Sequence, residues 1–130
     1  MKKHPQIGAR ILNDVKQLED IIPGVLYHHE RYDGKGYPAA LAGPNIPLMG
    51  RIICLADCFD AMTSSRTYRK ALPLEVALNE IRRCSGTQFD PALAEVFLRT
   101  SPDGFRELLS DHRAKAMKFR ELQETIRMAV

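Results

Sequence analysis

Apolar residues recur three and four positions apart through most of this sequence, and this spacing constrains the fold more than any other feature. Prolines and capping acids mark where the repeats begin, and glycines mark where they end. The predicted helices, with approximate bounds, are residues 5–17, 20–31, 48–64, 73–84 and 91–99, and a long amphipathic helix from Phe105 to Ile126. The alternating pattern of a strand is absent from the sequence. An all-α fold is therefore expected.

The composition is typical of a folded, water-soluble protein. The 130 residues suffice for one domain with a modest core, and 45% of them are hydrophobic. The net charge of +3 comes without dense Lys/Arg blocks, so DNA binding is not expected, although an anionic ligand is compatible with it. The sequence contains neither the apolar run of a signal peptide nor a segment as long as a membrane span. A cytoplasmic protein without membrane contact is expected.

The three cysteines are interpreted as small core residues. Cys54, Cys58 and Cys84 are odd in number, and the first two lie one helical turn apart within an apolar stretch. A disulfide framework is therefore not expected, and a reducing cytosol fits this pattern better. Because the cysteines have no activating neighbour in the sequence, a catalytic thiol is not expected either.

Two adjacent histidines, His28 and His29, fall near the end of the predicted helix 20–31. Neighbouring helical positions project about 100° apart, so such a pair suits two neighbouring metal ions better than one. The alternative, one core histidine and one surface histidine, stays open for the pair alone. The residues that follow, 33–47, contain six glycines and prolines, which predicts a loop.

The helix predicted over residues 48–64 carries two acids in apolar surroundings. Leu48, Ile52, Leu55 and Phe59 form one stripe, and Asp57 and Asp60 lie on an adjoining face, which predicts a buried helix with a polar seam. A buried carboxylate is costly unless it is paired or bound to a metal. The alternative, exposed acids or partners of nearby arginines, stays open.

A compact basic group follows this helix, with Arg66 and Arg69 three positions apart. A planar guanidinium gives phosphate two parallel hydrogen bonds, so the pair is a candidate phosphodiester clamp. A solvated helix end is the commoner use of such residues. Nitrogen and carboxylate donors together suit iron or manganese, and a two-metal site suits phosphodiester hydrolysis.

Four segments closely resemble the motifs of the HD-GYP domain family, in the family's order. They are His4-Pro5 with Gly8 (HPxxG), His28 to Pro38 (HHExxDGxGYP), Ala56 to Arg69 (ADxFDAxTxxRxYR) and Gly86 to Pro91 (GxxFDP). The resemblance covers about residues 1–100, and residues 101–130 are expected to form an amphipathic tail helix. It implies a helical bundle of the HD-domain type.

The resemblance also implies a function and roles for individual residues. The function is metal-dependent hydrolysis of cyclic di-GMP, or a related cyclic dinucleotide, to the linear dinucleotide or GMP in bacterial signal transduction, with two divalent iron or manganese ions. The implied metal ligands are His4, His28, His29 and Asp57; Asp57 and Asp60 serve the catalytic centre, Gly36 and Tyr37 line the substrate pocket, and Arg66 and Arg69 hold the phosphates.

The sequence begins where the family has a further helical segment with its His-Asp pair. A domain truncated at its amino terminus is therefore expected, with a poorly populated metal centre and weak or absent hydrolysis unless manganese or iron is added. Two alternatives stay open. One is a non-catalytic regulatory module that uses the loop with Gly36 and Tyr37 and the basic group to bind a signalling protein or a nucleotide, and the other is a homodimer formed through the tail helix.

Overall fold

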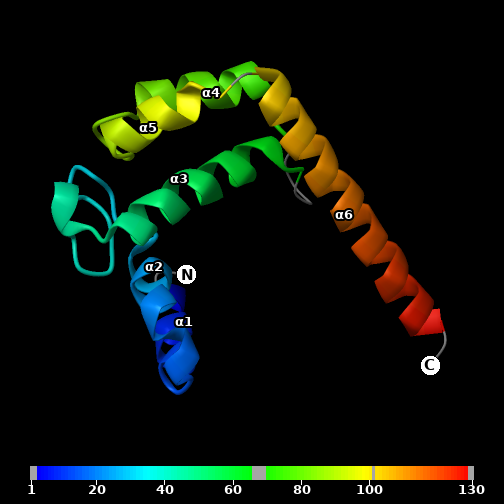
Figure 1. Cartoon of the computed structure of the whole chain (residues 1–130), viewed down its shortest axis with the longest axis horizontal. Coiled ribbons are helices and arrows are strands. Elements are labelled where there is room, and N and C mark those ends of the chain that lie inside the picture. The colour runs from blue at the N-terminus through cyan, green and yellow to red at the C-terminus, as the bar shows by residue number, and fades with distance from the viewer. Residues whose placement is uncertain (1–2, 66–69, 101, 129–130) are drawn as a thin grey trace. The chain divides into compact units, whose positions relative to one another are not determined.

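The structure, a computed structural model, describes residues 3–65, 70–100 and 102–128. Within these ranges it contains six α-helices, two short 3₁₀ helices and one isolated bridge, between Ser85 and Phe89. The predicted all-α fold is confirmed. In chain order the helices are α1 (His4–Asn13), η1 (Lys16–Ile21), α2 (Ile22–Tyr27), η2 (Gly43–Asn45), α3 (Leu48–Thr63), α4 (Leu74–Arg83), α5 (Pro91–Leu98) and α6 (Pro102–Met128). Figure 1 labels the α-helices among them.

The helices from residue 48 onward begin close to where the sequence predicts them. The side chain of Asp90 accepts the amide of Ala92 at 2.8 Å and so caps α5. The two earlier predictions are wrong in their bounds. The first helix ends at Asn13 instead of about residue 17. The predicted helix 20–31 is divided into η1 and the short α2, which ends at Tyr27.

A glycine of α2 lies where this helix packs against α3. Helix α2 packs against both α1 and α3, and its Gly24 faces Met49 of α3. A Cβ atom at Gly24 would lie 2.6 Å from Cγ of Met49, well inside van der Waals contact. Gly24 therefore leaves room for the Met49 side chain where α2 packs against α3.

The core lies where α3, α4 and α5 meet. Its buried members are Cys54, Leu55, Ile81, Cys84, Phe89 and Ala94. Complete burial of one large aliphatic side chain such as Ile81 contributes roughly 1.5–3 kcal/mol to stability. All three cysteines are free, and two of them are buried, as expected for core residues.

The predicted apolar stripe of α3 is only partly buried. Leu55 is 6% exposed, and Phe59 contacts Phe97 of α5 edge to face, with 5.0 Å between ring centroids. Leu48 and Ile52, however, are 54% and 47% exposed, so the prediction of their burial is wrong. The periodicity identifies an apolar face, whereas burial depends on which elements cover it, and α4 and α5 cover the later turns of α3.

One arginine connects three segments of the chain: α3, the residues before α3 and the residue before α5. Arg51, in the first turn of α3, donates from Nε to the carbonyl of Ile46 at 2.9 Å and from Nη1 to the carboxylate of Asp90. Asp90 is 6% exposed, so the pair is largely withdrawn from water. Removing one partner of such a buried pair is strongly destabilising, because the other charge is left uncompensated.

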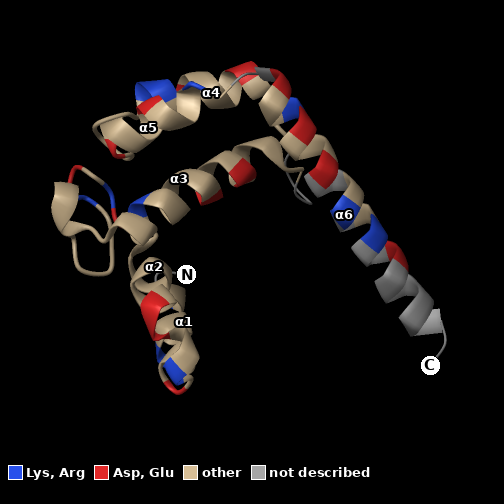
Figure 2. Ribbon diagram, in the orientation of Figure 1, with Lys and Arg blue, Asp and Glu red and all other residues tan. Residues whose placement is uncertain are grey.

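The chain divides into two compact units, Met1–Leu98 and Arg99–Val130. The second unit consists mainly of α6, and acidic and basic residues are interspersed along the coloured part of this helix (Figure 2). Within the ranges that the structure describes, none of the helices is long and apolar enough to cross a membrane. A domain boundary after residue 100 and homodimerisation through α6 stay predictions.

Candidate metal centre

Three histidine rings converge at the ends of α1 and α2. His4 is the first residue of α1, and His28 and His29 directly follow α2. The Nε2 atom of His4 lies 3.0 Å from Nε2 of His29 and 3.4 Å from Nε2 of His28. Among the described residues, these three histidines form a cluster that could hold a metal ion, with their ligand atoms within 4.8 Å of one another. Two of the rings are half-buried, and His4 is exposed.

The distances from Nε2 of His4 to Nε2 of His28 and of His29 are those of two ligands on one metal ion. Imidazole nitrogens bind transition metals at about 2.0–2.1 Å, which places two ligands of one tetrahedral or octahedral ion roughly 2.9–3.4 Å apart. The separations of 3.0 Å and 3.4 Å from His4 Nε2 fall in this interval. Neutral rings this close can share an N–H proton or a common electron-pair acceptor. A divalent cation is such an acceptor.

Hydrogen bonding and burial prepare the rings for this role. Nδ1 of His28 lies 2.6 Å from the carbonyl of Val25, and because a carbonyl only accepts, Nδ1 carries the proton and leaves Nε2 as the ligand atom. Burial, and then the nearby His28 and His4, lower the pKa of His29, an effect that Asp57 partly opposes. The lowered pKa favours the neutral ring, which is the form that binds metal.

The prediction that His28 and His29 project about 100° apart from a helix is wrong, because α2 ends before them. The amide of Glu30 donates to the carbonyl of Tyr27 at 3.0 Å in the turn that follows the helix. This turn brings the two rings together, with 4.1 Å between their centroids. Both rings lie beside His4, with the ligand atoms of all three histidines within 4.8 Å of one another.

A tightly folded loop places Tyr37 against the histidines. The ring of Tyr37 stacks on His29, with 4.8 Å between centroids and 20° between planes. Its amide donates to the carbonyl of His29 at 3.2 Å, and a cis peptide bond joins it to Pro38. Burial, and secondarily Asp57, raise the pKa of the Tyr37 phenol, so it stays protonated at neutral pH. Of the two residues expected to line the substrate pocket, Tyr37 therefore lies at the cluster.

Gly36 lies where the loop folds back on itself. A Cβ atom there would lie 2.4 Å from the amide nitrogen of Arg31, 2.5 Å from Cα of Glu30 and 2.6 Å from the carbonyl oxygen of His29. All three neighbours are backbone atoms, which have no rotamer to change. Gly36 therefore permits the approach that brings Tyr37 to His29.

A buried carboxylate orders the same loop, and sequence reasoning assigned it no role. Glu30 is 2% exposed. Its Oε1 accepts the amide of Ala39 at 2.6 Å, and its Oε2 accepts the amide of Leu41 at 3.1 Å. Two charge-assisted hydrogen bonds compensate the burial of the charge. The sequence offers one sign of this role, an acid directly after two histidines. The partners of Glu30 are backbone amides, which every residue type except proline has, so they cannot be recognised from the sequence.

The two candidate acids of α3 are exposed, so the prediction that they line a buried seam is wrong. Asp57 still acts on the cluster through its charge, which influences the pKa values of His29 and Tyr37. It is not a member of the three-histidine group. Asp60 lies one turn further along and accepts a hydrogen bond from the hydroxyl of Ser64 at 2.9 Å. Arg66 and Arg69 lie outside the described residues.

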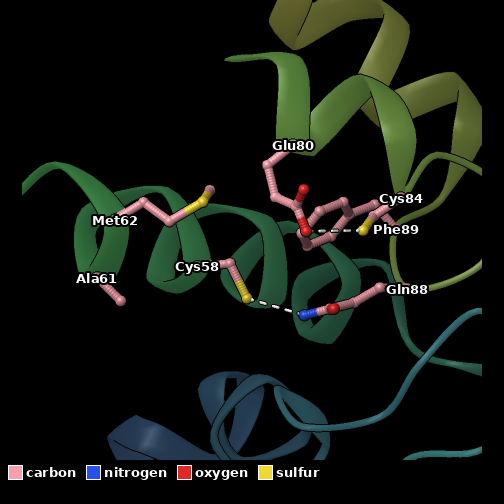
Figure 3. A pocket seen from close by; sticks show the side chains of 7 residues that line it. All are labelled: Cys58, Ala61, Met62, Glu80, Cys84, Gln88 and Phe89. Atoms are coloured by element: carbon pink, nitrogen blue, oxygen red, sulfur yellow. Dashed lines mark hydrogen bonds between the residues drawn. The ribbon is translucent and has the colours of Figure 1, made fainter. Parts of the chain in front are cut away.

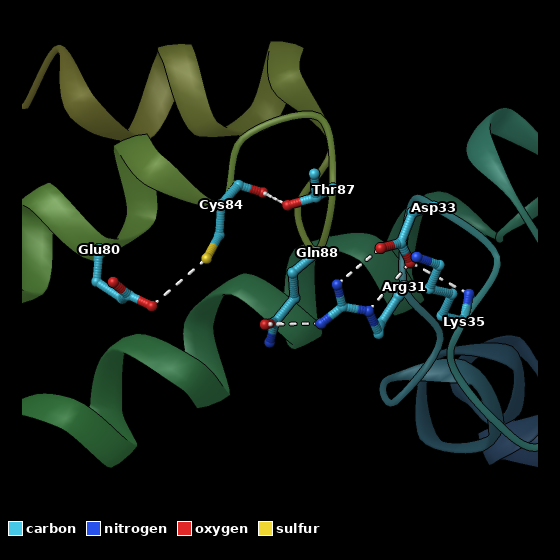
Figure 4. A network of polar contacts seen from close by, with 7 residues as sticks. All are labelled: Arg31, Asp33, Lys35, Glu80, Cys84, Thr87 and Gln88. Carbon is cyan, nitrogen blue, oxygen red and sulfur yellow. Dashed lines mark hydrogen bonds and ion pairs between the residues drawn. The ribbon is translucent and has the colours of Figure 1, made fainter.

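An ion pair braces the beginning of the loop (Figure 4). Arg31 donates to Asp33 from Nε at 3.0 Å and from Nη2 at 2.7 Å, and the amide of Lys35 donates to Oδ1 of Asp33 at 3.1 Å. These contacts, the hydrogen bond from Arg31 first among them, lower the pKa of Asp33 from 3.8 to about 2. The carboxylate therefore remains charged well into the acid range.

Acidification is expected to loosen this part of the loop. A carboxyl whose pKa is lower in the folded than in the unfolded chain stabilises the fold above the unfolded value and loses that contribution as the pH falls through the folded value. The contribution of Asp33 is therefore complete above about pH 4 and is lost between about pH 4 and pH 2.

Hydrogen exchange of the Gly34 and Lys35 amides measures this loss of loop stability. Asp33→Asn should exchange faster near neutral pH and respond less to acid; equal acid responses in the two proteins would contradict the assignment.

The fold and the three histidines define an α-helical domain with a candidate metal centre, and comparison with known proteins agrees. The sequence profile of the HD domain family matches residues 1–93. A cyclic di-GMP phosphodiesterase of Thermotoga maritima is 46% identical over 103 residues, which are 76% of this chain and 27% of that protein. A 3'3'-cGAMP-specific phosphodiesterase of Vibrio cholerae is 39% identical over 100 residues, 75% of this chain and 19% of that protein.

A solved structure gives the same result. The crystal structure of a cyclic GMP-AMP specific phosphodiesterase of Vibrio cholerae superimposes with a TM-score of 0.61 and 29% identity, over 78% of this chain and 26% of that one. The chain belongs to the HD domain family, as a member of its HD-GYP group. It spans 27% of the length of the Thermotoga enzyme and 19% of the length of the 3'3'-cGAMP-specific Vibrio enzyme.

Proposed function

We propose that this chain is part of a cytoplasmic, metal-dependent phosphodiesterase that hydrolyses cyclic di-GMP, or a related cyclic dinucleotide, to the linear dinucleotide or GMP in bacterial signalling. The observation that carries the proposal is the convergence of three imidazole nitrogens within 4.8 Å of one another. The phosphodiesterase activities named for the Thermotoga and Vibrio relatives support it.

In this proposal two divalent ions, iron or manganese, are held by ligands that include His4, His28, His29 and Asp57, because these metals suit a mixed set of nitrogen and oxygen donors. The bound metal supplies Lewis acidity toward the phosphodiester and water. Burial keeps the ring of His29 neutral and available as a ligand. The Asp57 carboxylate adds negative charge beside the rings, which favours a cation there.

The remaining residues of the proposal act on the substrate. The protonated phenol of Tyr37 donates a hydrogen bond to a phosphoryl oxygen, and Gly36 lets the loop hold Tyr37 at the rings. Asp60, three positions after Asp57 on α3, takes the proton of the attacking water. Arg66 and Arg69 hold the phosphates through charge-assisted hydrogen bonds.

The test is to strip the chain of metal, reload it with manganese or iron under anaerobic conditions, and measure bound metal and cyclic di-GMP hydrolysis together. We expect metal to bind and the linear dinucleotide or GMP to be released only by the loaded protein. A chain that binds neither metal nor nucleotide would contradict the proposal. Binding of cyclic di-GMP without metal or product would instead identify the non-catalytic module considered from the sequence.

A further inference from the structure

The side chain of Gln88, in the segment between α4 and α5, spans two elements that carry proposed site residues. Its Oε1 accepts a hydrogen bond from Nη1 of Arg31 at 3.2 Å, and its Nε2 donates to Sγ of Cys58 at 3.0 Å (Figures 3 and 4). A guanidinium only donates, so the amide oxygen must face Arg31 and the amide nitrogen must face the thiol. The orientation of the amide is therefore fixed by chemistry.

The backbone around Gln88 is docked on the same loop. The amide of Tyr32 donates to the carbonyl of Gln88 at 3.2 Å, and the amide of Asp33 donates to the carbonyl of Thr87 at 2.8 Å. Residues 87–88 thus contact residues 31–33 through both main chain and side chain. Cys58 lies on α3, directly after Asp57. The Gln88 amide, which binds both Cys58 and Arg31, therefore links this helix to the beginning of the loop.

The contacts continue from Arg31 to the histidines. Arg31 holds Asp33, whose carboxylate holds the amide of Lys35. The next residue, Gly36, lies against the amide nitrogen of Arg31, at 2.4 Å from its would-be Cβ. A displacement of Arg31 therefore reaches Gly36 and Tyr37, the residue that stacks on His29.

The Gln88 side chain lies beside open space. It lines a pocket of about 230 Å³, together with Cys58, Ala61, Met62, Glu80, Cys84 and Phe89 (Figure 3). A side chain beside such a space has room to move away when its polar partners are lost. The hydrogen bond from Arg31 is charge-assisted and is worth more than a neutral one.

We propose that Gln88 is a positioning residue that holds Arg31, and through it the loop carrying Tyr37, in register with the histidine cluster. The structural part of this inference, the ordering of the loop, rests on the contacts described above. Its expected effect on substrate affinity rests on the proposed phosphodiesterase function. It assigns to the Gly86–Pro91 segment a role in ordering the site in addition to capping α5.

Three variants of the full chain separate the contribution of the hydrogen bond from Arg31 to Gln88 from that of the hydrogen bond from Gln88 to Cys58. Gln88→Met keeps the length of the side chain and loses both hydrogen bonds. Gln88→Glu keeps the acceptor for Arg31 and loses the donor to Cys58. Cys58→Ala removes the thiol partner alone. If the Arg31 contact is the one that positions the loop, Gln88→Met should be impaired, whereas the other two variants should stay close to wild type.

The first measurement is hydrogen exchange of the amides of residues 31–41 in the metal-free chain. We expect these amides to exchange about tenfold faster in Gln88→Met, the effect of losing a hydrogen bond worth about 1.4 kcal/mol, with α3 and α5 unchanged. Gln88→Glu should stay within about twofold of wild type. Unchanged loop exchange in Gln88→Met, equal damage in both Gln88 variants, or a uniform rise across the helices would overturn the positioning role.

The second measurement is the affinity of the manganese-loaded chain for cyclic di-GMP. Gln88→Met should weaken this affinity about fivefold to tenfold, with unchanged metal content. The affinity of Gln88→Glu should be close to that of the wild type. Equal affinities in wild type and Gln88→Met would overturn the link to substrate. A wild-type chain that binds no cyclic di-GMP would overturn the proposed function itself, which the exchange experiment does not depend on.

Discussion

Replacing His29 with alanine is expected to lower the affinity of the chain for a divalent transition metal by at least about 100-fold, because changes to residues that merely support metal ligands already cost about 10–100-fold. His29 supplies one of the three convergent nitrogens, and its Nε2 lies 3.0 Å from that of His4. The two remaining imidazoles would offer an incomplete ligand set. Calorimetric titration of the metal-free protein with manganese or zinc measures the change.

The matched control is His112→Ala. His112 is the fourth histidine of the sequence and belongs to α6, in the other compact unit. This variant should bind metal as the wild type does. If His29→Ala and His112→Ala lost affinity equally, or if neither did, the three-histidine cluster would not be the metal centre.

Replacing Gly36 with alanine is expected to destabilise the folded loop by about 3 kcal/mol or more, the upper range for overpacking a filled site. The new Cβ atom would meet three backbone atoms at 2.4–2.6 Å, so residues 29–31 or 36–37 would have to move apart. The stacking of Tyr37 on His29 should be lost with them. Urea unfolding measures the stability, and hydrogen exchange of residues 29–41 locates the change.

Gly43→Ala is the control for the removal of a glycine from this loop. Gly43 has a φ of 55°, and a Cβ atom there would have nothing within 4 Å, so its cost is conformational strain of about 1 kcal/mol without steric overlap. Gly36 does not have a positive φ, so its cost is steric. Equal stability losses in the two variants would contradict a close-approach role for Gly36.

The helices that the sequence predicts well are those with local start signals. Asp90 and Pro91 lie at the start of α5, and the predicted 48–64 and 73–84 differ from α3 and α4 by one residue at the ends. The end of α2 was mispredicted because its cause is not local. Glu30 binds the amides of Ala39 and Leu41, nine and eleven positions away, and no periodicity encodes such a contact.

The candidate site shows the same limit. The helical spacing of apolar residues says nothing about which histidines meet, and His4 and His28 are 24 positions apart. Only the resemblance to a family grouped His4 with His28 and His29. The burial of Asp57 and Asp60 was mispredicted because an apolar helix face indicates a tendency to be covered, without showing what covers it. Gln88 was missed because its partners are a thiol and a distant guanidinium.

The three candidate ligands lie at the start of α1 and directly after α2, and this arrangement has a thermodynamic consequence. His4 opens α1 and the histidine pair directly follows α2, so an ion bound between them would cross-link the chain across the η1 segment and oppose separation of the helix pair. By linkage, the free energy of ion binding adds to the free energy of keeping α1 and α2 paired. A chelating agent would therefore act on this helix pair as a denaturant does, and loss of the ion and fraying of the amino terminus would be two measures of a single equilibrium.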